Sequence, residues 1–217
     1  MTIAIDMGKN NSDVGNVRNH GFSLVEVLMV TLIIIVLAAI GIPSLMSMVR
    51  GLRTAGDARD LNGLIIQAKM RAASNFSRTR VYADLSANTF RIETQPSGTT
   101  GWTTDCPSGC NQSLSKGVSF GFGSLSSPPG GTQATLGQAP LCKDNITDTT
   151  DTANTACIIF NSRGIPITPG TVPAPTPTGE DAVYVTDGKS VTGVTVSLTG
   201  LTKIWRTEAT GANWTQQ

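Results

Sequence analysis

Four cysteines offer the widest choice of chemistry in this sequence, because a thiol can act as a nucleophile, bind a metal ion or form a disulfide. They are Cys106, Cys110, Cys142 and Cys157. The single histidine is His20, so no imidazole follows it that could activate a cysteine or serine nucleophile. A zinc site would need all four thiolates, and one closely spaced pair followed by two scattered cysteines fits poorly. We therefore expect two disulfides in an oxidising compartment, with Cys106–Cys110 and Cys142–Cys157 as the nearest-neighbour pairing.

The stretch 143–151 gathers carboxylates, which are the ligands that calcium prefers. Asp144, Asp148 and Asp151 do not follow the alternating ladder with a central glycine that a calcium loop needs, so we interpret the stretch as a solvated loop. The sequence also contains no glycine-rich phosphate loop and no other metal-ligand spacing. We expect no enzyme activity, no cofactor and no metal site.

One acidic residue, Glu26, stands at the start of a long apolar run. Residues 27–49 contain no charged side chain, and a helix of that length spans about 34 Å, against about 30 Å for the hydrocarbon core of a bilayer. The run predicts one membrane-spanning helix. A carboxylate in such a helix usually faces protein, water or a cation, although an acid at a helix N-terminus also suits an ordinary membrane anchor.

The stretch Gly-Phe-Ser-Leu-Val-Glu at 21–26, with the apolar run and Pro43 behind it, resembles the N-terminal signature of type IV prepilins and type II secretion pseudopilins. The resemblance implies that 1–21 is a leader and that a prepilin peptidase cleaves between Gly21 and Phe22. The same enzyme would methylate the new amino group of Phe22. Residues 22–49 would be kept as the transmembrane half of a long helix, which also forms the core of a filament.

Glu26 and Pro43 have expected roles in this interpretation. Cleavage exposes an ammonium group at Phe22, and opposite charges tolerate an apolar filament core only when they are paired. We therefore expect Glu26 of one subunit to pair with Phe22 of a neighbour and to set the registry of assembly. Pro43 removes one backbone donor and is expected to kink or locally melt the helix.

The cleavage signature also gives the expected orientation. It implies a single-pass protein of the bacterial inner membrane. The leader would lie in the cytoplasm and the head in the periplasm. A count of positive charges favours the opposite orientation, because Arg50, Arg53 and Arg59 follow the apolar run. We give the cleavage signature precedence.

Residues 50–78 are expected to continue the helix as its amphipathic half. Apolar residues recur at helical spacing, which predicts one buried stripe. The other side chains include many cations, which we interpret as a solvated face, with lipid headgroups, DNA or neighbouring subunits as alternative partners. The stripe comprises Leu45, Val49, Leu52, Leu61, Leu64, Ile65, Ala68, Ala72 and Phe76. The cations are Arg50, Arg53, Arg59, Lys69, Arg71, Arg78 and Arg80.

Residues 79–217 are expected to form a β-rich head, since glycine is abundant, aromatic residues are few and the net charge is +1. Alternating polar and apolar residues predict a hairpin at 79–94, and Asp187-Gly188-Lys189 marks the turn of a second hairpin. The proline-rich stretch 166–177 is expected to be an exposed loop without strand pairing. The expected strands are 79–85, 89–94, 117–122, 156–160, 182–186, 190–198 and 202–207.

This order of elements resembles the GspH/FimT branch of the prepilin superfamily. The implied fold class is α+β, the type IV pilin fold, in which a long N-terminal helix packs on an antiparallel β-sheet head. The implied function is that of a minor structural subunit of a type IV pilus or a type II secretion pseudopilus. Its implied partners are the prepilin peptidase, other major and minor pilins or pseudopilins, and the inner-membrane assembly platform.

Two other functions stay open. A DNA-binding minor pilin for natural transformation would carry Gly-Arg-x-Arg near its C-terminus. The matching place reads Gly200-Leu201-Thr202-Lys203, with Arg206 beyond it, so at most a weak phosphate contact through Lys203 and Arg206 is expected. The chain could instead be a membrane-anchored periplasmic domain that is not assembled.

Overall fold

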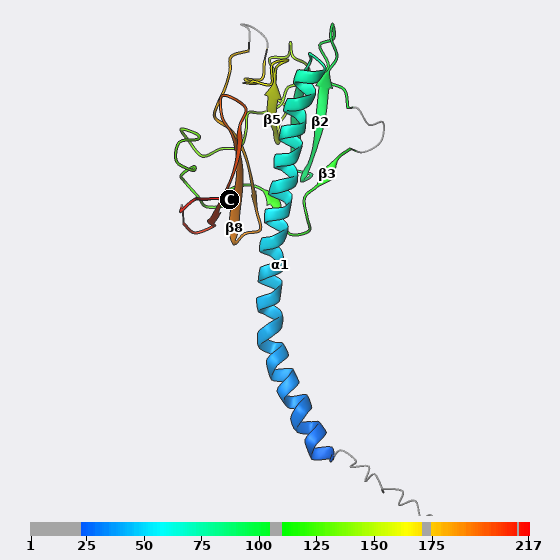
Figure 1. The fold of residues 1–217 in the computed structure, drawn as a ribbon, viewed down its shortest axis with the longest axis vertical. Helices are drawn as coiled ribbons and strands as arrows, with labels where there is room; N and C mark the ends of the chain where they lie inside the picture. The colour runs from blue at the N-terminus through cyan, green and yellow to red at the C-terminus, as the bar shows by residue number, and fades with distance from the viewer. Residues whose placement is uncertain (1–22, 105–109, 171–174, 212) are drawn as a thin grey trace, which may run out of the picture. The chain divides into compact units, whose positions relative to one another are not determined.

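The structure is a computed structural model that describes residues 23–104, 110–170, 175–211 and 213–217. The chain divides into two compact units, Met1–Ser44 and Leu45–Gln217, and each is described by itself. Helix α1 (Leu24–Ser74) contributes its first part to one unit and its second part to the other (Figure 1). The predicted long helix is confirmed, although it ends at Ser74 and not at residue 78.

The end of α1 is set by Phe76, whose backbone is left-handed. Asn75 N donates to Arg71 O at 3.0 Å, and Ser77 N donates to Ala72 O at 3.2 Å. Phe76 has a φ of 48° and its side chain is 83% exposed. A left-handed residue just after the last turn is a common way to close a helix. Phe76 was expected in the buried stripe, and this expectation is wrong.

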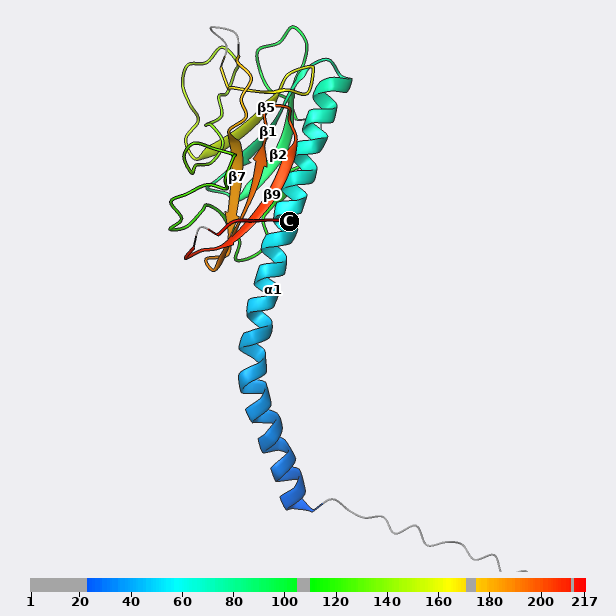
Figure 2. The same cartoon turned by 60° about the vertical axis from the view of Figure 1, so that its left-hand side comes forward.

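The strands of the second unit form two antiparallel five-stranded sheets, where one sheet was expected (Figures 1 and 2). The first sheet, in the order β3-β2-β1-β5-β6, contains β1 (Arg78–Asp84), β2 (Thr89–Gln95), β3 (Gln112–Ser113), β5 (Thr155–Phe160) and β6 (Pro166–Ile167). The second sheet, in the order β10-β9-β8-β7-β4, contains β4 (Ser119–Phe120), β7 (Asp181–Thr186), β8 (Ser190–Val196), β9 (Thr202–Glu208) and β10 (Thr215–Gln216).

Both predicted hairpins are confirmed, and an aspartate stabilises the turn of each. Asp84 Oδ1 accepts from Ser86 N at 3.0 Å and from Ala87 N at 2.8 Å in the β1–β2 turn. Asp187 Oδ1 accepts from Lys189 N at 2.9 Å in the β7–β8 turn. These bonds satisfy backbone donors that the turns leave outside the strand ladders.

The expectation that 166–177 lacks strand pairing is wrong at both ends of the stretch, because Pro166 and Ile167 form a strand and Pro177 forms an antiparallel bridge with Ile167. Pro166 and Ile167 form β6, opposite Phe160 and Ile159 of β5, and both are buried. Proline is tolerated here because it is the first residue of a short edge strand, where no ladder donor is required.

The core joins one face of α1 to one face of each sheet. Leu61, Ile65 and Ala68 of α1 are fully buried in the same cluster as side chains of β1, β2, β5, β7 and β8. The predicted stripe is confirmed from Leu61 to Ala72, but Leu52 is 63% exposed. The offset of nine positions from Leu52 to Leu61 corresponds to a net rotation of about 180° around a helix, so these two leucines lie on opposite faces. Leu45 and Val49 are likewise exposed.

Loops cover the other face of the second sheet. Tyr184 of β7 is fully buried there, with the rings of Phe122 and Trp214 at centroid distances of 6.0 and 5.7 Å. Its hydroxyl donates to Gln133 Oε1 at 2.7 Å, and burial raises the pKa of this phenol. Gly193 is required beneath the ring, because a Cβ there would lie 2.5 Å from Tyr184 Cε1.

Candidate assembly helix and the head that it carries

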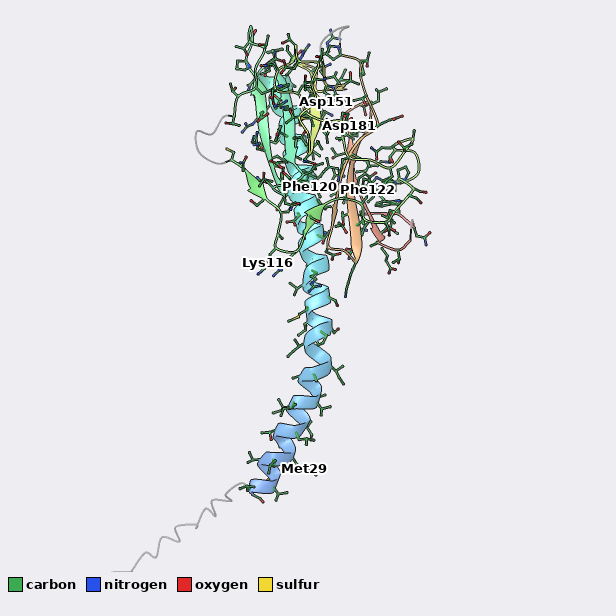
Figure 3. The ribbon with its side chains drawn as sticks, turned by 180° about the vertical axis from the view of Figure 1, so that it is seen from behind. Met29, Lys116, Phe120, Phe122, Asp151 and Asp181 are labelled. Atoms are coloured by element: carbon green, nitrogen blue, oxygen red, sulfur yellow. A yellow bond between two sulfur atoms is a disulfide. The ribbon has the colours of Figure 1, made fainter. Side chains whose placement is uncertain are left out.

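The first part of α1 presents its apolar side chains to the surroundings. Leu24, Ile35 and Ile40 are 76%, 68% and 73% exposed, and Met29 projects from the helix in Figure 3. By length and composition α1 can cross a membrane, and other described residues bury none of its most apolar window. Transfer out of water stabilises each large apolar side chain by about 1.5–3 kcal/mol. Lipid or apolar partner helices would therefore stabilise this segment.

Glu26 lies in the first turn of α1. Ser23 O accepts from Glu26 N at 3.0 Å and from Val27 N at 3.1 Å. An acid in the first turn complements the helix dipole, and Ser-x-x-Glu is the spacing of a capping box. Gly21 and Phe22 lie outside the described residues. Cleavage, methylation and the pairing of Glu26 with Phe22 therefore stay predictions.

Pro43 lies inside α1, and the helix is continuous on both sides of it. The alternative that the helix melts at Pro43 is thus not what the structure shows. Proline lacks the donor that would reach the carbonyl one turn earlier, so this turn is held by one hydrogen bond fewer.

The cations that follow the apolar run were expected to form a solvated face, but several of them contact the head instead. Lys69 Nζ donates to Thr199 O at 3.1 Å and to Gly200 O at 3.0 Å, which ties α1 to the β8–β9 turn. Arg53 Nη1 donates to Lys116 O at 3.2 Å and ties α1 to the loop before β4. Arg80 belongs to β1 and is 4% exposed. The interpretation as a solvated face is wrong for Lys69 and Arg80, and Arg53 has a structural role in addition.

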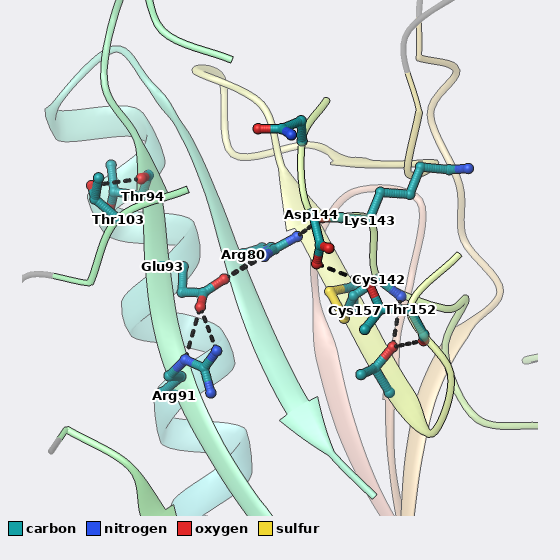
Figure 4. Close-up of polar contacts among 12 residues, drawn as sticks. Arg80, Arg91, Glu93, Thr94, Thr103, Cys142, Lys143, Asp144, Thr152 and Cys157 are labelled. Atoms are coloured by element: carbon teal, nitrogen blue, oxygen red, sulfur yellow. Dashed lines mark hydrogen bonds and ion pairs between the residues drawn. A yellow bond between two sulfur atoms is a disulfide. The ribbon is translucent and has the colours of Figure 1, made fainter. Parts of the chain in front are cut away.

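Glu93 of β2 binds two arginines on the first sheet (Figure 4). Arg80 Nε donates to Glu93 Oε2 at 2.6 Å, and Arg91 Nε donates to Glu93 Oε1 at 2.8 Å. The Arg80 guanidinium lies 4.3 Å from the centroid of the Trp102 ring. Burial lowers the pKa of Arg80, and the charge of Glu93 opposes that shift. Since Arg80 Nη1 also donates to Lys143 O at 2.6 Å, the cluster holds the 140–152 loop on the sheet.

Cys142 and Cys157 form a disulfide with an S–S distance of 2.00 Å, as in the nearest-neighbour pairing. Cys110 is disulfide-bonded, whereas Cys106 lies outside the described residues, so their pairing stays a prediction. The nearby carboxylates bond within their own loop. Asp151 lies 3.1 Å from Lys143 Nζ, and Asp148 Oδ2 accepts from Asn145 N at 3.0 Å. Asp144 Oδ1 accepts from Thr152 Oγ1 at 3.1 Å.

Lys203 and Arg206, the expected phosphate contacts, are not brought together. They stand three residues apart on β9, and side chains of odd and even positions in a strand point to opposite faces. Lys203 is exposed, with its Nζ 5.8 Å from the centroid of the Trp205 ring. Arg206 points to α1, where its Nη2 lies 3.1 Å from the position that a Cβ on Gly51 would take. The pair does not form a phosphate clamp.

Asp181 is a residue that the sequence analysis missed. It is the first residue of β7, it is 3% exposed, and its Oδ2 has no hydrogen-bond partner among the described residues. Burial, with a smaller effect of the neighbouring Glu180 charge, raises the pKa of Asp181 to about 7. The only sequence signal was an acid immediately before the apolar strand Ala-Val-Tyr-Val.

Comparison with known proteins gives little that bears on function. No family model matches the chain, and no curated protein matches it. Among solved structures, the chain is similar to the minor pseudopilin EpsH from the type II secretion system of Vibrio cholerae, at 11% identity. That match covers 72% of this chain and 94% of the EpsH chain, with a TM-score of 0.41. A likeness this weak carries no conclusion about function.

Proposed function

We propose that this chain is a pilin-like structural subunit, a minor component of a type IV pilus or of a type II secretion pseudopilus. One combination carries the proposal: the Gly21-Phe22 and Glu26 signature precedes an apolar helix segment that no other described residue covers, and the same helix continues into a folded head. A prepilin peptidase removes 1–21 on the cytoplasmic side of the bacterial inner membrane. Residues 22–49 then anchor the head in the periplasm.

The uncovered helix serves first as a membrane anchor and then as a part of the filament core. In the bilayer its apolar side chains contact lipid, and in the filament they contact the helices of other pilins or pseudopilins on the assembly platform. Glu26 is the one charged side chain between Phe22 and Arg50. A carboxylate in such a core requires a cation, and the Phe22 ammonium of a neighbouring subunit provides it.

The head supplies a rigid shape and no reaction. The second part of α1 shares its core with both sheets, so this part of the helix and the two sheets form one packed unit. Several groups that could do chemistry have structural partners: Cys142 is bonded to Cys157, and Glu93 lies between two arginines.

Processing is tested by intact-mass spectrometry of the membrane-extracted protein from cells with and without a prepilin peptidase. We expect a chain that starts at Phe22, carries one added methyl group and lacks the hydrogens of two disulfides, only in cells with the peptidase. A full-length chain in both cells would refute the proposal and leave an anchored periplasmic domain.

Assembly is tested with Glu26→Ala, which removes the carboxylate. We expect the variant to be cleaved and to stay in the membrane but to be absent from sheared filaments. Thr31→Ala is the matched control, since Thr31 Oγ1 only donates to Leu28 O one turn back in the helix. Equal incorporation of both variants would show that Glu26 does not set the registry.

A further inference from the structure

Four cations that are distant in sequence gather around one turn of α1, at the end of its apolar segment. Arg50 and Arg53 belong to the helix. Lys116 is beside them because its carbonyl accepts from Arg53 Nη1 at 3.2 Å, and Figure 3 shows Lys116 next to α1. Arg206 reaches the same turn from β9, with its Nη2 against Gly51. We call these four residues, Arg50, Arg53, Lys116 and Arg206, the basic collar.

Among the described residues, the collar has no carboxylate partner. None of its four cations forms a salt bridge with another residue in the described part of the chain. Asp57, one turn further along α1 from Arg53, is 6% exposed and its two oxygens accept from Ser115 N at 3.0 Å and Ser115 Oγ at 2.8 Å. The carboxylate nearest in sequence is therefore already used to hold the loop that carries Lys116.

Two further carboxylates lie toward this end of the second sheet. Glu208 is two residues from Arg206 on the same face of β9, and Asp187 belongs to the β7–β8 turn. Asp187 is partly satisfied by backbone donors of its own turn, and Lys189 adds another exposed cation there. Positive charge therefore predominates at this end of the head.

The position of the collar along the chain matches the headgroup layer of a bilayer. The charge-free run ends at residue 49 and Arg50 follows at once. At 1.5 Å per residue, Arg53 stands only about 6 Å further along the helix axis than Val49. Cations at the boundary of a membrane-spanning segment attract anionic headgroups, and the attraction falls off within a Debye length of about 8 Å.

We propose that the basic collar binds the phosphates of anionic phospholipids in the outer leaflet of the membrane that α1 crosses, and so docks the base of the head on the bilayer before assembly. The inference rests on the proposed membrane anchoring. It also gives a reason for the arginines that follow the apolar run. In a plain count of positive charges on the two sides of the membrane, these arginines oppose the expected orientation.

The test uses the full chain in nanodiscs of phosphatidylcholine alone or of an equal mixture with phosphatidylglycerol. Hydrogen exchange is measured at the backbone amides of Lys116 and Gly117, in an exposed part of the loop. We expect exchange to slow several-fold in the anionic discs and the slowing to disappear at high salt. Each collar cation that is removed should weaken docking about fivefold.

The collar variant is Arg50→Gln, Arg53→Gln and Lys116→Gln. The matched control, Arg59→Gln, Arg163→Gln and Lys203→Gln, removes the same charge from three exposed positions outside the collar. We expect only the collar variant to lose the lipid-dependent protection. The proposal would be overturned by equal protection in both kinds of disc, or by an equal loss of protection in the collar variant and its control. It would also be overturned if inorganic phosphate or duplex DNA, added to neutral discs, gave the same protection. A chain that does not float with the discs would instead contradict membrane anchoring.

Discussion

Asp181 is a buried acid, and one of its oxygens has no hydrogen-bond partner among the described residues. Its ionisation therefore opposes folding at neutral pH. Because its pKa rises from 3.8 to about 7 on folding, the folded chain holds a proton that the unfolded chain releases. The stability that this bound proton contributes to the folded chain is fully present below about pH 4 and is lost as the pH rises through about 7.

Asp181→Asn should therefore remove this contribution to the pH dependence of the free energy of unfolding. At about pH 8 we expect the variant to be more stable than the natural chain by about 2–4 kcal/mol, and at about pH 4 to be equal to it. Urea unfolding at both pH values measures the difference. Glu180→Gln is the control and should keep most of the dependence, because burial is the larger cause of the shift. An unchanged pH slope in Asp181→Asn would contradict the assignment.

Glu93 is the counter-charge of a buried arginine. Glu93→Gln leaves Arg80, at 4% exposure, without an anionic partner among the described residues, and we expect a loss of about 3–5 kcal/mol in the free energy of unfolding. Asp60→Asn, an exposed carboxylate on α1, should change it by less than about 0.5 kcal/mol. Chemical unfolding of both variants compares the two. If replacing Arg80 and Glu93 together by apolar residues costs as much as Glu93→Gln, the unpaired charge is not the cause.

Functional and structural residues could be recognised in the sequence only where they form a motif of residues that are close together in the chain. Gly21, Phe22 and Glu26 stand close together, so their signature could be read directly. The Glu93 cluster could not, because Arg80, Trp102 and Lys143 reach it from separate elements. Lys203 and Arg206 were grouped by proximity in sequence, although strand geometry separates them.

At the scale of elements, the backbone of the β8–β9 turn lies close to that of the β5–β6 turn, and the Lys69 side chain ties the β8–β9 turn to α1. Gly200 has a φ of 71°, and a Cβ there would lie 2.8 Å from Gly164 O. Gly188, in the β7–β8 turn, has a φ of 83° and nothing within 4 Å of such a Cβ. The two glycines therefore share a backbone constraint and differ in the space around them.

Gly188→Ala should cost about 1 kcal/mol for the left-handed backbone alone. Gly200→Ala should cost about 1–3 kcal/mol more, because the methyl group overlaps a carbonyl and pushes on Lys69. Thermal unfolding of both variants isolates the effect of close packing. Similar losses for the two would show that the β8–β9 turn can move away from Gly164 and the Lys69 side chain.

The elements themselves were predictable to different degrees. The helix and both hairpins follow from local patterns, namely helical periodicity, alternation and Asp-containing turns. The two-sheet arrangement did not follow, because a local pattern does not tell which strands pair: β5 pairs with β1 in one sheet, and β7 pairs with β8 in the other. Strands β6 and β10 have two residues each and no periodicity to detect. Residues 117–122 were expected as a strand, but only Ser119 and Phe120 pair, and they pair with β7 of the second sheet.

At the scale of the whole molecule, the Cys142–Cys157 disulfide closes a loop with a sequence separation of 15. Replacing both cysteines by alanine should destabilise the head by about 3 kcal/mol through the unfolded state, and lower its Tm by roughly 6–12 °C. Calorimetry of the variant measures this. Asp151→Asn, which removes an ion pair of the same loop, should lower the Tm much less. Equal shifts in Tm for the two variants would mean that the disulfide cross-link contributes little to the stability of the head.

The edges of the two sheets bear on how the molecule avoids unwanted association. The outermost strands β3, β6, β4 and β10 have two residues each, and β9 carries Lys203 where β10 no longer covers it. Long, flat edges template the addition of strands from other chains, whereas short edges and edge lysines oppose it. In the filament that we propose, short edges of this kind would keep neighbouring heads from merging into amyloid-like sheets, so that polymerisation would proceed through the helix.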